Sequence, residues 1–439
     1  MDPFVIKGIQ LLLSLSILVV LHELGHFIPA KLFKTKVEKF YLFFDVNFAL
    51  FKKKIGDTEY GIGWLPLGGY VKIAGMIDES MDTEQMKQPP QPWEFRSKPA
   101  WQRLIIMLGG VTVNIVLGFL IYMMILFVWG KETLPTEDVP NGLNATALAE
   151  SIGFQDGDQV LAVDGSPLEY VLDINKHLFL RSPETVTVMH ANGVRENLNI
   201  PEDFGTQMFE AGDMYPLNPA GPIYVDSLYP GNPAETAGMK VGDVLLSFDG
   251  KPITTLDDLR SDDLKEQDSV VFSILRENSE KTITVFPTEK AVLGFIIRPK
   301  LDFQTTHVDL GFNQSIEEGF RYGYWTLHDY VAQFKYIFTK KGASQVGGFG
   351  AIGNLFPAQW DWQGFWSSTA LISIILAFMN VLPVPALDGG HVMFLLYEML
   401  SGRKPNDKFM EYAQMFGFFL LLALVLFANG NDLYRWLFG

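Results

Sequence analysis

The chain has 439 residues, of which 48% are hydrophobic, and its mean hydropathy is +0.15. Water-soluble enzymes of this length are rarely so apolar, so these values favour a membrane protein. Cysteine is absent, which excludes disulfides, thiolate metal sites and cysteine nucleophiles. The net charge is −16, and residues 130–362 hold 17 basic against 34 acidic residues, a balance that argues against binding of nucleic acid.

Four apolar stretches are long enough to cross about 30 Å of hydrocarbon as helices. They cover Phe4–Phe33, Leu104–Trp129, Phe365–Leu382 and Phe409–Phe427. Basic residues concentrate in the first and third connections between these stretches, with 12 Lys and Arg between Lys31 and Arg103. Because basic loops stay in the cytoplasm, we expect both termini and the acidic segment 130–362 to lie on the opposite side of the membrane.

The first apolar stretch contains the sequence His22-Glu23-Leu24-Gly25-His26. On a helix, residues four apart share a face, so the two imidazoles can bind one Zn²⁺ and Glu23 can reach a water beside it. Ionisable groups at membrane depth are costly and seldom occur without a function. The alternative is a helix end that leaves the bilayer with its polar groups at the lipid headgroups, although apolar residues continue beyond His26.

The first connection also carries a β-strand signal. Two short apolar runs between Glu59 and Ala74 flank Pro66 and Gly68-Gly69, which predicts a β-hairpin over residues 63–74. Further along, Gln88–Pro99 mixes proline and polar residues with tryptophan and phenylalanine, which suits an amphipathic segment at the membrane surface. The alternative for this last segment is a surface loop without a function.

The acidic segment contains an internal repeat. Residues 153–165 (GFQDGDQVLAVDG) recur as residues 238–250 (GMKVGDVLLSFDG), at a constant offset of 85 residues. Each copy predicts a helix that ends at glycine, a Gly-Asp turn, an apolar strand and an Asp-Gly turn. This pattern resembles the PDZ domain, which implies a groove where a peptide adds a strand to a sheet edge. The alternative is a pair of β-rich spacers that bind nothing.

A catalytic zinc site needs a third protein ligand and an open position for water. We expect Asp388, at the end of the Pro-rich segment that starts at Asn380, because it lies at the depth expected for His26. His391 is an alternative by depth, and Asp45 is a weaker one. Asp388 can instead cap a turn, since Asp-Gly pairs form turns. The remaining histidines fall in the acidic segment, away from this depth: His177, His190, His307 and His328.

The HExxH helix, the Asn380–Asp388 segment and the tandem PDZ-like units together resemble the site-2 protease family of intramembrane zinc metalloproteases, within it most of all the bacterial RseP type. The resemblance covers nearly the whole chain. It implies that zinc is bound by three residues, His22, His26 and Asp388. It also implies that Glu23 is the general base and that Asn380 helps to hold the substrate or the oxyanion.

The same resemblance implies that the hairpin re-enters the membrane and binds substrate. The residues of this sequence that would do so are Leu67, Gly68, Gly69 and Tyr70. The second apolar stretch departs from the family, because Gly110-Val111 stands where Gly-Pro often precedes an asparagine. The role of Asn114 therefore stays open, and close helix packing through Gly109 and Gly110 is favoured.

The resemblance implies an endopeptidase that cuts transmembrane segments of single-span membrane proteins already trimmed on the outer side. Such partners are anti-sigma factors of the envelope stress response and remnant signal peptides. It implies the bacterial inner membrane, with the PDZ-like pair and both termini in the periplasm. The competing hypothesis is a non-catalytic PDZ-bearing membrane scaffold. A metal transporter is disfavoured, because no inverted repeat and no spread of acidic residues over several stretches is found.

The predicted fold class is therefore a multi-pass α-helical membrane protein with four transmembrane helices, a membrane-associated β-hairpin and two tandem PDZ-like α/β domains outside the cytoplasm. The predicted boundaries in chain order are 1–35, 36–102 and 103–130 for the first helix, cytoplasmic loop and second helix, 131–215 and 216–302 for the PDZ-like domains, 303–363 for a connector, 364–390 for the third helix, 391–408 for a cytoplasmic loop and 409–430 for the fourth helix.

Overall fold

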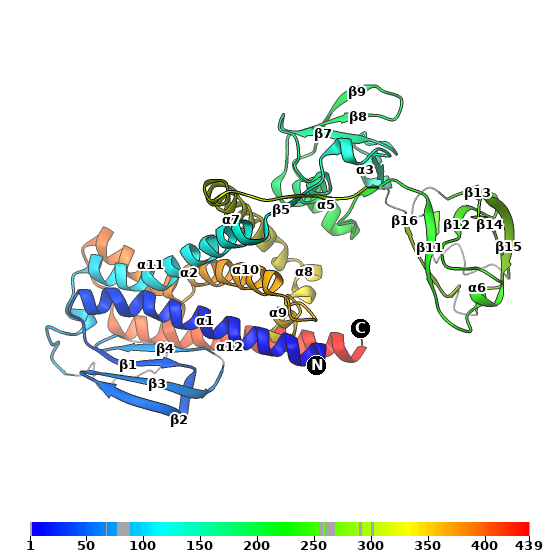
Figure 1. Ribbon diagram of the computed structural model, residues 1–439. Helices are drawn as coiled ribbons and strands as arrows, with labels where there is room; N and C mark the ends of the chain where they lie inside the picture. Colours follow the sequence, from blue (N-terminus) through cyan, green and yellow to red (C-terminus); the bar gives the residue numbers. More distant parts are fainter. Residues whose placement is uncertain are drawn as a thin grey trace. The chain divides into compact units, whose positions relative to one another are not determined.

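The structure, a computed structural model, describes residues 2–66, 68–76, 88–253, 258–259, 268–288, 292–299 and 303–438. The chain forms two compact units (Figure 1). One, the helical unit, joins Met1–Gly130 to Asp309–Gly439, and the other, the β-rich unit, is Lys131–Val308. The candidate site lies in the helical unit, so this unit is described first.

Four helices among the described residues are long and apolar enough to cross a membrane: α1 (Pro3–Leu32), α2 (Ala100–Trp129), α10 (Trp362–Val381) and α12 (Asp407–Phe438). Each corresponds to one of the four apolar stretches of the sequence, with ends that differ by one residue at Phe33 and Leu382. The two ends of the chain lie at the same end of this unit (Figure 1). The other helices of the unit are η2 (Phe95–Ser97), α7 (Phe312–Phe334), η8 (Lys335–Phe338), α8 (Lys340–Gln345), α9 (Phe349–Gly353) and α11 (Asp388–Ser401).

Small residues set the packing of the long helices. A Cβ atom at Gly109 of α2 would overlap the carbonyl oxygen of Gly25 in α1, so the two backbones touch. On another part of α2, Gly319 of α7 lies against the backbone of Met123. In a membrane the hydrophobic effect does not drive helices together, because lipid tails are as apolar as the helices. Close contacts at small residues stabilise the packing instead, through van der Waals interactions. Helix α2 is therefore the central element, in contact with α1, α7, α10 and α11.

The predicted hairpin over residues 63–74 is wrong in its pairing. Strands β1 (Val37–Leu42), β2 (Phe44–Ile55), β3 (Thr58–Leu65) and β4 (Tyr70–Ile73) form a sheet in the order β2-β3-β1-β4. β1 therefore separates β3 from β4, pairing parallel with β3 and antiparallel with β4. The physical reason is burial. Val37 and Tyr41 of β1 are almost fully buried, which favours a place for β1 inside the sheet and not at its edge. The antiparallel hairpin of this sheet is β2–β3.

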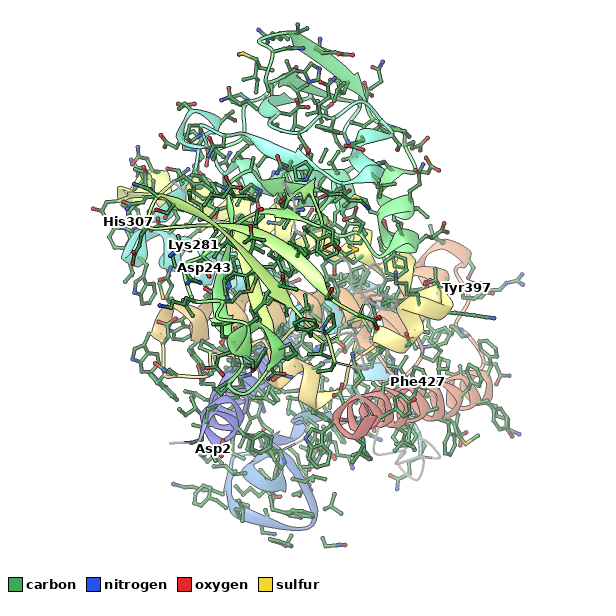
Figure 2. The ribbon with its side chains drawn as sticks, turned by 90° about the vertical axis from the view of Figure 1, so that its right-hand side faces the viewer. Asp2, Asp243, Lys281, His307, Tyr397 and Phe427 are labelled. Carbon is green, nitrogen blue, oxygen red and sulfur yellow. The ribbon has the colours of Figure 1, made fainter. Side chains whose placement is uncertain are left out.

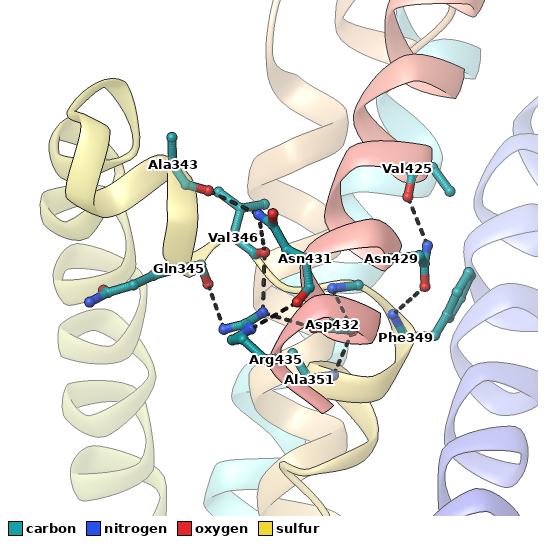
Figure 3. Close-up of polar contacts among 11 residues, drawn as sticks. Ala343, Gln345, Val346, Phe349, Ala351, Val425, Asn429, Asn431, Asp432 and Arg435 are labelled. Atoms are coloured by element: carbon teal, nitrogen blue, oxygen red, sulfur yellow. Dashed lines mark hydrogen bonds and ion pairs between the residues drawn. The ribbon is translucent and has the colours of Figure 1, made fainter. Parts of the chain in front are cut away.

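The end of α12 is tied to the segment around α8 and α9 by polar side chains (Figure 3). Asp432 accepts hydrogen bonds from the backbone N–H groups of Gly348 and Ala351, at 2.9 and 3.1 Å. The side chain of Asn431 donates to the carbonyl oxygens of Ala343 and Val346. The glycines at positions 347, 348 and 350 thus let this part of the backbone approach α12.

The β-rich unit contains two hydrophobic cores, one for each copy of the repeat. The strands of the first part are β5 (Lys131–Thr133), β6 (Leu143–Ala145), β7 (Gln159–Val163), β8 (Thr185–Met189), β9 (Arg195–Asn199) and β10 (Leu217–Pro219). Those of the second part are β11 (Ile223–Leu228), β12 (Val244–Phe248), β13 (Lys251–Pro252), β14 (Val270–Arg276), β15 (Ser279–Val285) and β16 (Phe295–Pro299), followed by β17 (Thr306–Val308), which pairs with β5. The short helices are η3 (Thr136–Asp138), α3 (Ala147–Glu150), η4 (Val171–Asp173), α4 (Ile174–Lys176), η5 (His177–Arg181), α5 (Phe204–Ala211) and α6 (Pro233–Thr236).

The two copies share local geometry at equivalent aspartates. Asp158 and Asp243 are both buried, and each accepts a hydrogen bond from the backbone N–H three residues earlier, at 2.9 and 2.8 Å. Their cationic partners differ, because Asp158 contacts His190 whereas Asp243 holds Arg276. The sheets also differ, with the order β7-β8-β9 in the first copy and β15-β14-β12-β11-β16 in the second.

Large apolar side chains point outward from the helical unit. Phe427 of α12 is 51% exposed and Tyr397 of α11 is 53% exposed (Figure 2). Exposed aromatic residues on long apolar helices are typical of a surface that faces lipid. The prediction of a helical membrane protein with added β structure is therefore confirmed.

Candidate metal centre

The two histidines of the HExxH sequence lie one turn apart on α1 and point the same way. Their Nε2 atoms are 3.2 Å apart, and the rings meet edge to face. His26 is 7% exposed, so its ring is almost entirely enclosed by protein. The helical period alone produces this pairing, because residues i and i+4 project from one face.

Asp388 approaches the histidines from the first turn of α11. Its Oδ2 atom lies 3.4 Å from His22 Nε2 and 3.3 Å from His26 Nε2. The preceding segment is held in place by Gln414 of α12, whose Oε1 accepts a hydrogen bond from the N–H of Ala386 at 2.6 Å. Ala386 has a φ of 75°, a left-handed conformation that turns the chain into α11.

Helix α2 contacts the far side of both imidazoles. His26 Nδ1 lies 2.8 Å from the carbonyl oxygen of Ile106, and Asn114 Nδ2 lies 3.1 Å from His22 Nδ1. Both Nδ1 atoms are thereby engaged, which leaves the two Nε2 atoms facing Asp388. A Cβ atom at Gly110 would overlap His26 Nε2 and crowd the ring of His22, so the absence of a side chain there keeps space open beside the ring nitrogens.

These residues fit a zinc ion. Ligands about 2.0–2.1 Å from a tetrahedral zinc are roughly 3.3 Å from each other, and the three potential ligand atoms are 3.2–3.4 Å apart. Asp388 Oδ2 is buried and makes no hydrogen bond, a costly state that a cation relieves. Within the described part of the chain, His22, His26 and Asp388 are the one group of three or more His, Asp or Glu with ligand atoms this close together.

The three residues line a cavity of about 770 Å³. Glu23 and Asn380, the other residues singled out in the sequence, line it too, as do Gly68, Gly69 and Tyr70. Leu67, the fourth residue predicted for the hairpin, lies outside the described residues.

The two alternative ligands named from the sequence also line this cavity but are not members of the three-residue group. His391 Nε2 lies 3.0 Å from Gln414 Nε2. Asp45 accepts hydrogen bonds from Tyr70 and Lys39, at 2.8 and 3.1 Å. Although burial acts to raise the pKa of Asp45, these hydrogen bonds leave that pKa below its ordinary value. Asp45 is thus a charged, structurally engaged group of the cavity wall.

Two histidines one helical turn apart and a carboxylate from a part of the chain far away in sequence form the set of ligands that is typical of zinc metallopeptidases, and a glutamate follows the first histidine. Here these residues belong to, or lie beside, helices apolar enough to cross a membrane. The sequence profile of peptidase family M50 matches residues 10–424. The chain therefore belongs to peptidase family M50, the site-2 proteases, and is a zinc-dependent intramembrane metalloprotease.

Curated relatives match along nearly their whole length. The chain is 25% identical to the "Regulator of sigma E protease" of Haemophilus influenzae, over 97% of this chain and 98% of the relative. It is 26% identical to the "Regulator of sigma-E protease RseP" of Escherichia coli, over 97% of each chain. It is 27% identical to the "Metalloprotease MmpA" of Caulobacter vibrioides, over 99% of this chain and 97% of the relative.

Proposed function

We propose that His22, His26 and Asp388 hold the zinc of this protease and that Glu23 is its general base. The observation that carries the proposal is the convergence of three ligand atoms within 3.4 Å in the cavity that Glu23 also lines. Zinc supplies a Lewis acid that polarises a peptide carbonyl and makes a nearby water more acidic.

The remaining chemistry falls to side chains of the cavity. Glu23 is one residue from His22 on the same helix, and its carboxylate takes the proton of the attacking water and passes it to the leaving nitrogen. Asn380, near the end of α10, donates an amide N–H to the oxygen on which negative charge develops. A preorganised donor of this kind is worth about 3 kcal/mol.

The β-sheet offers a template for an unwound substrate. A transmembrane helix must open its internal hydrogen bonds before its carbonyls are accessible, and unpaired backbone is costly in lipid. One edge of β4 pairs with β1, and no other strand among the described residues pairs with its second edge. Tyr70 and Val71 of β4 line the same cavity as Glu23. We propose that the substrate adds to β4 as a strand, with its scissile bond beside Glu23.

The names of two relatives support a proposal for the substrate class. Both are named regulators of sigma E, so we propose that this enzyme cuts single-span membrane proteins of the anti-sigma factor type, and remnant signal peptides, after an outer trimming step. The distribution of basic residues supports a cytoplasmic location for β1–β4. The tandem PDZ-like domains and both termini then face the periplasm across a bacterial inner membrane, where the domains capture new chain ends or exclude untrimmed substrates.

The test is a paired measurement on detergent-purified full chain: zinc per chain and cleavage of a model single-span substrate, for wild type, Glu23→Gln and the exposed control Glu202→Gln. We expect one zinc in all three and cleavage in wild type and control only. Loss of zinc in Glu23→Gln would contradict the assignment of Glu23 as base rather than ligand. Full cleavage by Glu23→Gln would overturn its role, and zinc without cleavage by any of the three would favour the non-catalytic scaffold.

A further inference from the structure

We infer that Asn114 is a positioning residue that fixes the tautomer of His22 by accepting a hydrogen bond from its Nδ1–H. This inference rests on the proposed zinc ligands, because a histidine that binds a metal through Nε2 carries its proton on Nδ1. That proton needs an acceptor, which also fixes the orientation of the ring. Asn114 is the side chain beside His22 Nδ1.

His26 shows the arrangement that His22 should match. Its Nδ1 lies 2.8 Å from the backbone carbonyl oxygen of Ile106, and a carbonyl can only accept. His26 therefore carries its proton on Nδ1 and presents the lone pair of Nε2 toward Asp388. Ile106 and Asn114 both belong to α2, two turns apart, so one helix orients both imidazoles.

The tautomer that a zinc-binding histidine needs decides which amide atom of Asn114 faces His22. Asn114 is 0% exposed, and its Oδ1 is buried without a hydrogen-bond partner while Nδ2 faces the ring. A half-turn of the amide about its Cβ–Cγ bond exchanges oxygen and nitrogen at little change in shape. The rotated amide places Oδ1 where it accepts the Nδ1–H of His22, whereas the unrotated amide would point a donor at a nitrogen that already carries a proton.

A third helix steadies this contact. Ser373 of α10 donates its hydroxyl hydrogen to the backbone carbonyl of Asn114 at 2.7 Å, and both residues are fully buried. α10 also leads into the segment that carries Asp388. Helix α10 therefore supports Asn114 and also precedes the segment that carries Asp388, the third proposed ligand.

The experiment compares zinc affinity, measured by competition with a chelator at fixed pH, for wild type, Asn114→Leu, Asn114→Asp and Ser373→Ala in the full chain. Losing an acceptor beside a ligand histidine typically weakens metal binding about 10–100-fold, and we expect this loss for Asn114→Leu. Asn114→Asp keeps an acceptor oxygen at the same place, so it should bind zinc more tightly than Asn114→Leu and close to wild type. Ser373→Ala leaves the acceptor oxygen in place but removes the hydrogen bond that supports it, so it should weaken zinc binding less than Asn114→Leu does.

A spectroscopic measurement separates positioning from folding. Co²⁺ in place of zinc gives visible absorption that reports the ligand geometry, and we expect it to change in Asn114→Leu and to be retained in Asn114→Asp. If Asn114→Leu does not fold, Asn114→Ala takes its place, because alanine is the best helix former. Equal zinc affinity in wild type and the apolar variant, or an Asp variant as weak as the apolar one, would overturn the inference. A wild type that binds no zinc would instead overturn the proposed ligands.

Discussion

Gly25 and Gly109 meet backbone to backbone, with the carbonyl oxygen of each occupying the place where the other would carry a side chain. This contact lies beside the candidate metal centre, because Gly25 precedes His26 and Gly109 precedes Gly110. It brings α2 close enough for the Ile106 carbonyl and the Asn114 amide to reach the imidazoles of α1. Helix packing and ligand orientation are thus set by the same pair of residues.

Gly109→Ala should weaken both the fold and the site. Its methyl group would overlap the Gly25 carbonyl, and overpacking of this kind costs about 1–3 kcal/mol. We expect a thermal midpoint lower by several degrees and weaker zinc binding, measured on purified protein. The matched control is Gly8→Ala on α1, where nothing lies within 4 Å and helix propensity improves by about 1 kcal/mol. Equal midpoints for the two variants would contradict the close contact.

Gly110→Ala should remove zinc while the fold persists. A methyl group at this position projects onto His22 and His26 at their ring nitrogens, where the metal would sit. We expect zinc per chain to fall at least tenfold with a thermal midpoint of the metal-free protein near that of wild type. Metal analysis after dialysis against a zinc buffer measures this, and a fully loaded Gly110→Ala variant would argue against the proposed site.

Gln414→Leu should lower cleavage by disordering the segment before Asp388. The Gln414 side chain accepts from the Ala386 N–H, and without it that partly buried donor loses its partner, which costs about 1 kcal/mol. We expect cleavage to fall about tenfold, whereas Gln414→Glu, which keeps the acceptor oxygen, should retain more activity. Initial rates on a model substrate measure both, and a Glu variant weaker than the Leu variant would reject this reasoning.

The first copy of the repeat should lose stability above neutral pH while the second does not. Hydrogen bonds to Asp158 and Glu196 raise the pKa of His190 above its ordinary value. The stabilisation is therefore complete below about pH 6.5 and is lost as the pH rises through the folded pKa. In the second copy the guanidinium of Arg276, which stays charged, takes this place beside Asp243.

Hydrogen exchange of the full chain between pH 6 and 9, corrected for intrinsic rates, measures this contrast. We expect protection of β7–β9 to decrease with pH relative to β12–β14, which serves as the internal control. His190→Gln removes the titrating group, so its β7–β9 protection should follow the pH dependence of the second copy. A parallel loss of protection in both copies of the wild type would exclude His190 as the cause.

The sequence alone predicted the residues that belong to a recognisable motif. The period of a helix places His22 and His26 on one face, and a third oxygen ligand was sought at the same depth, where Asp388 lies. The contribution of α2 escaped this reasoning. A backbone carbonyl such as that of Ile106 leaves no trace in a sequence, and the face of α2 that meets α1 depends on tertiary packing. A lone asparagine within an apolar helix was the available signal for Asn114.

The sheet shows the same limit. The turn residues around Gly68 favour a hairpin between β3 and β4. The order of strands, however, depends on which strand buries the most surface, and the strand that pairs with β4 is the buried strand Val37–Leu42. Likewise, α11 begins at Asp388 and continues into the segment expected as a loop, because it packs its apolar residues against α2. Local sequence patterns thus predicted where strands and helices lie in the chain better than they predicted which elements pair or pack with each other.

The distribution of the three proposed ligands along the chain has a consequence for biosynthesis. His22 and His26 are made early, whereas Asp388 follows His26 by 362 residues. At about 5–20 residues per second, about 20–70 s of translation separate them. During that interval the chain holds only two of the three proposed ligands, so we expect it to bind zinc weakly. We expect an enzyme built in this way to spare the membrane proteins that are inserted beside it until Asp388 has been made and has reached the two histidines.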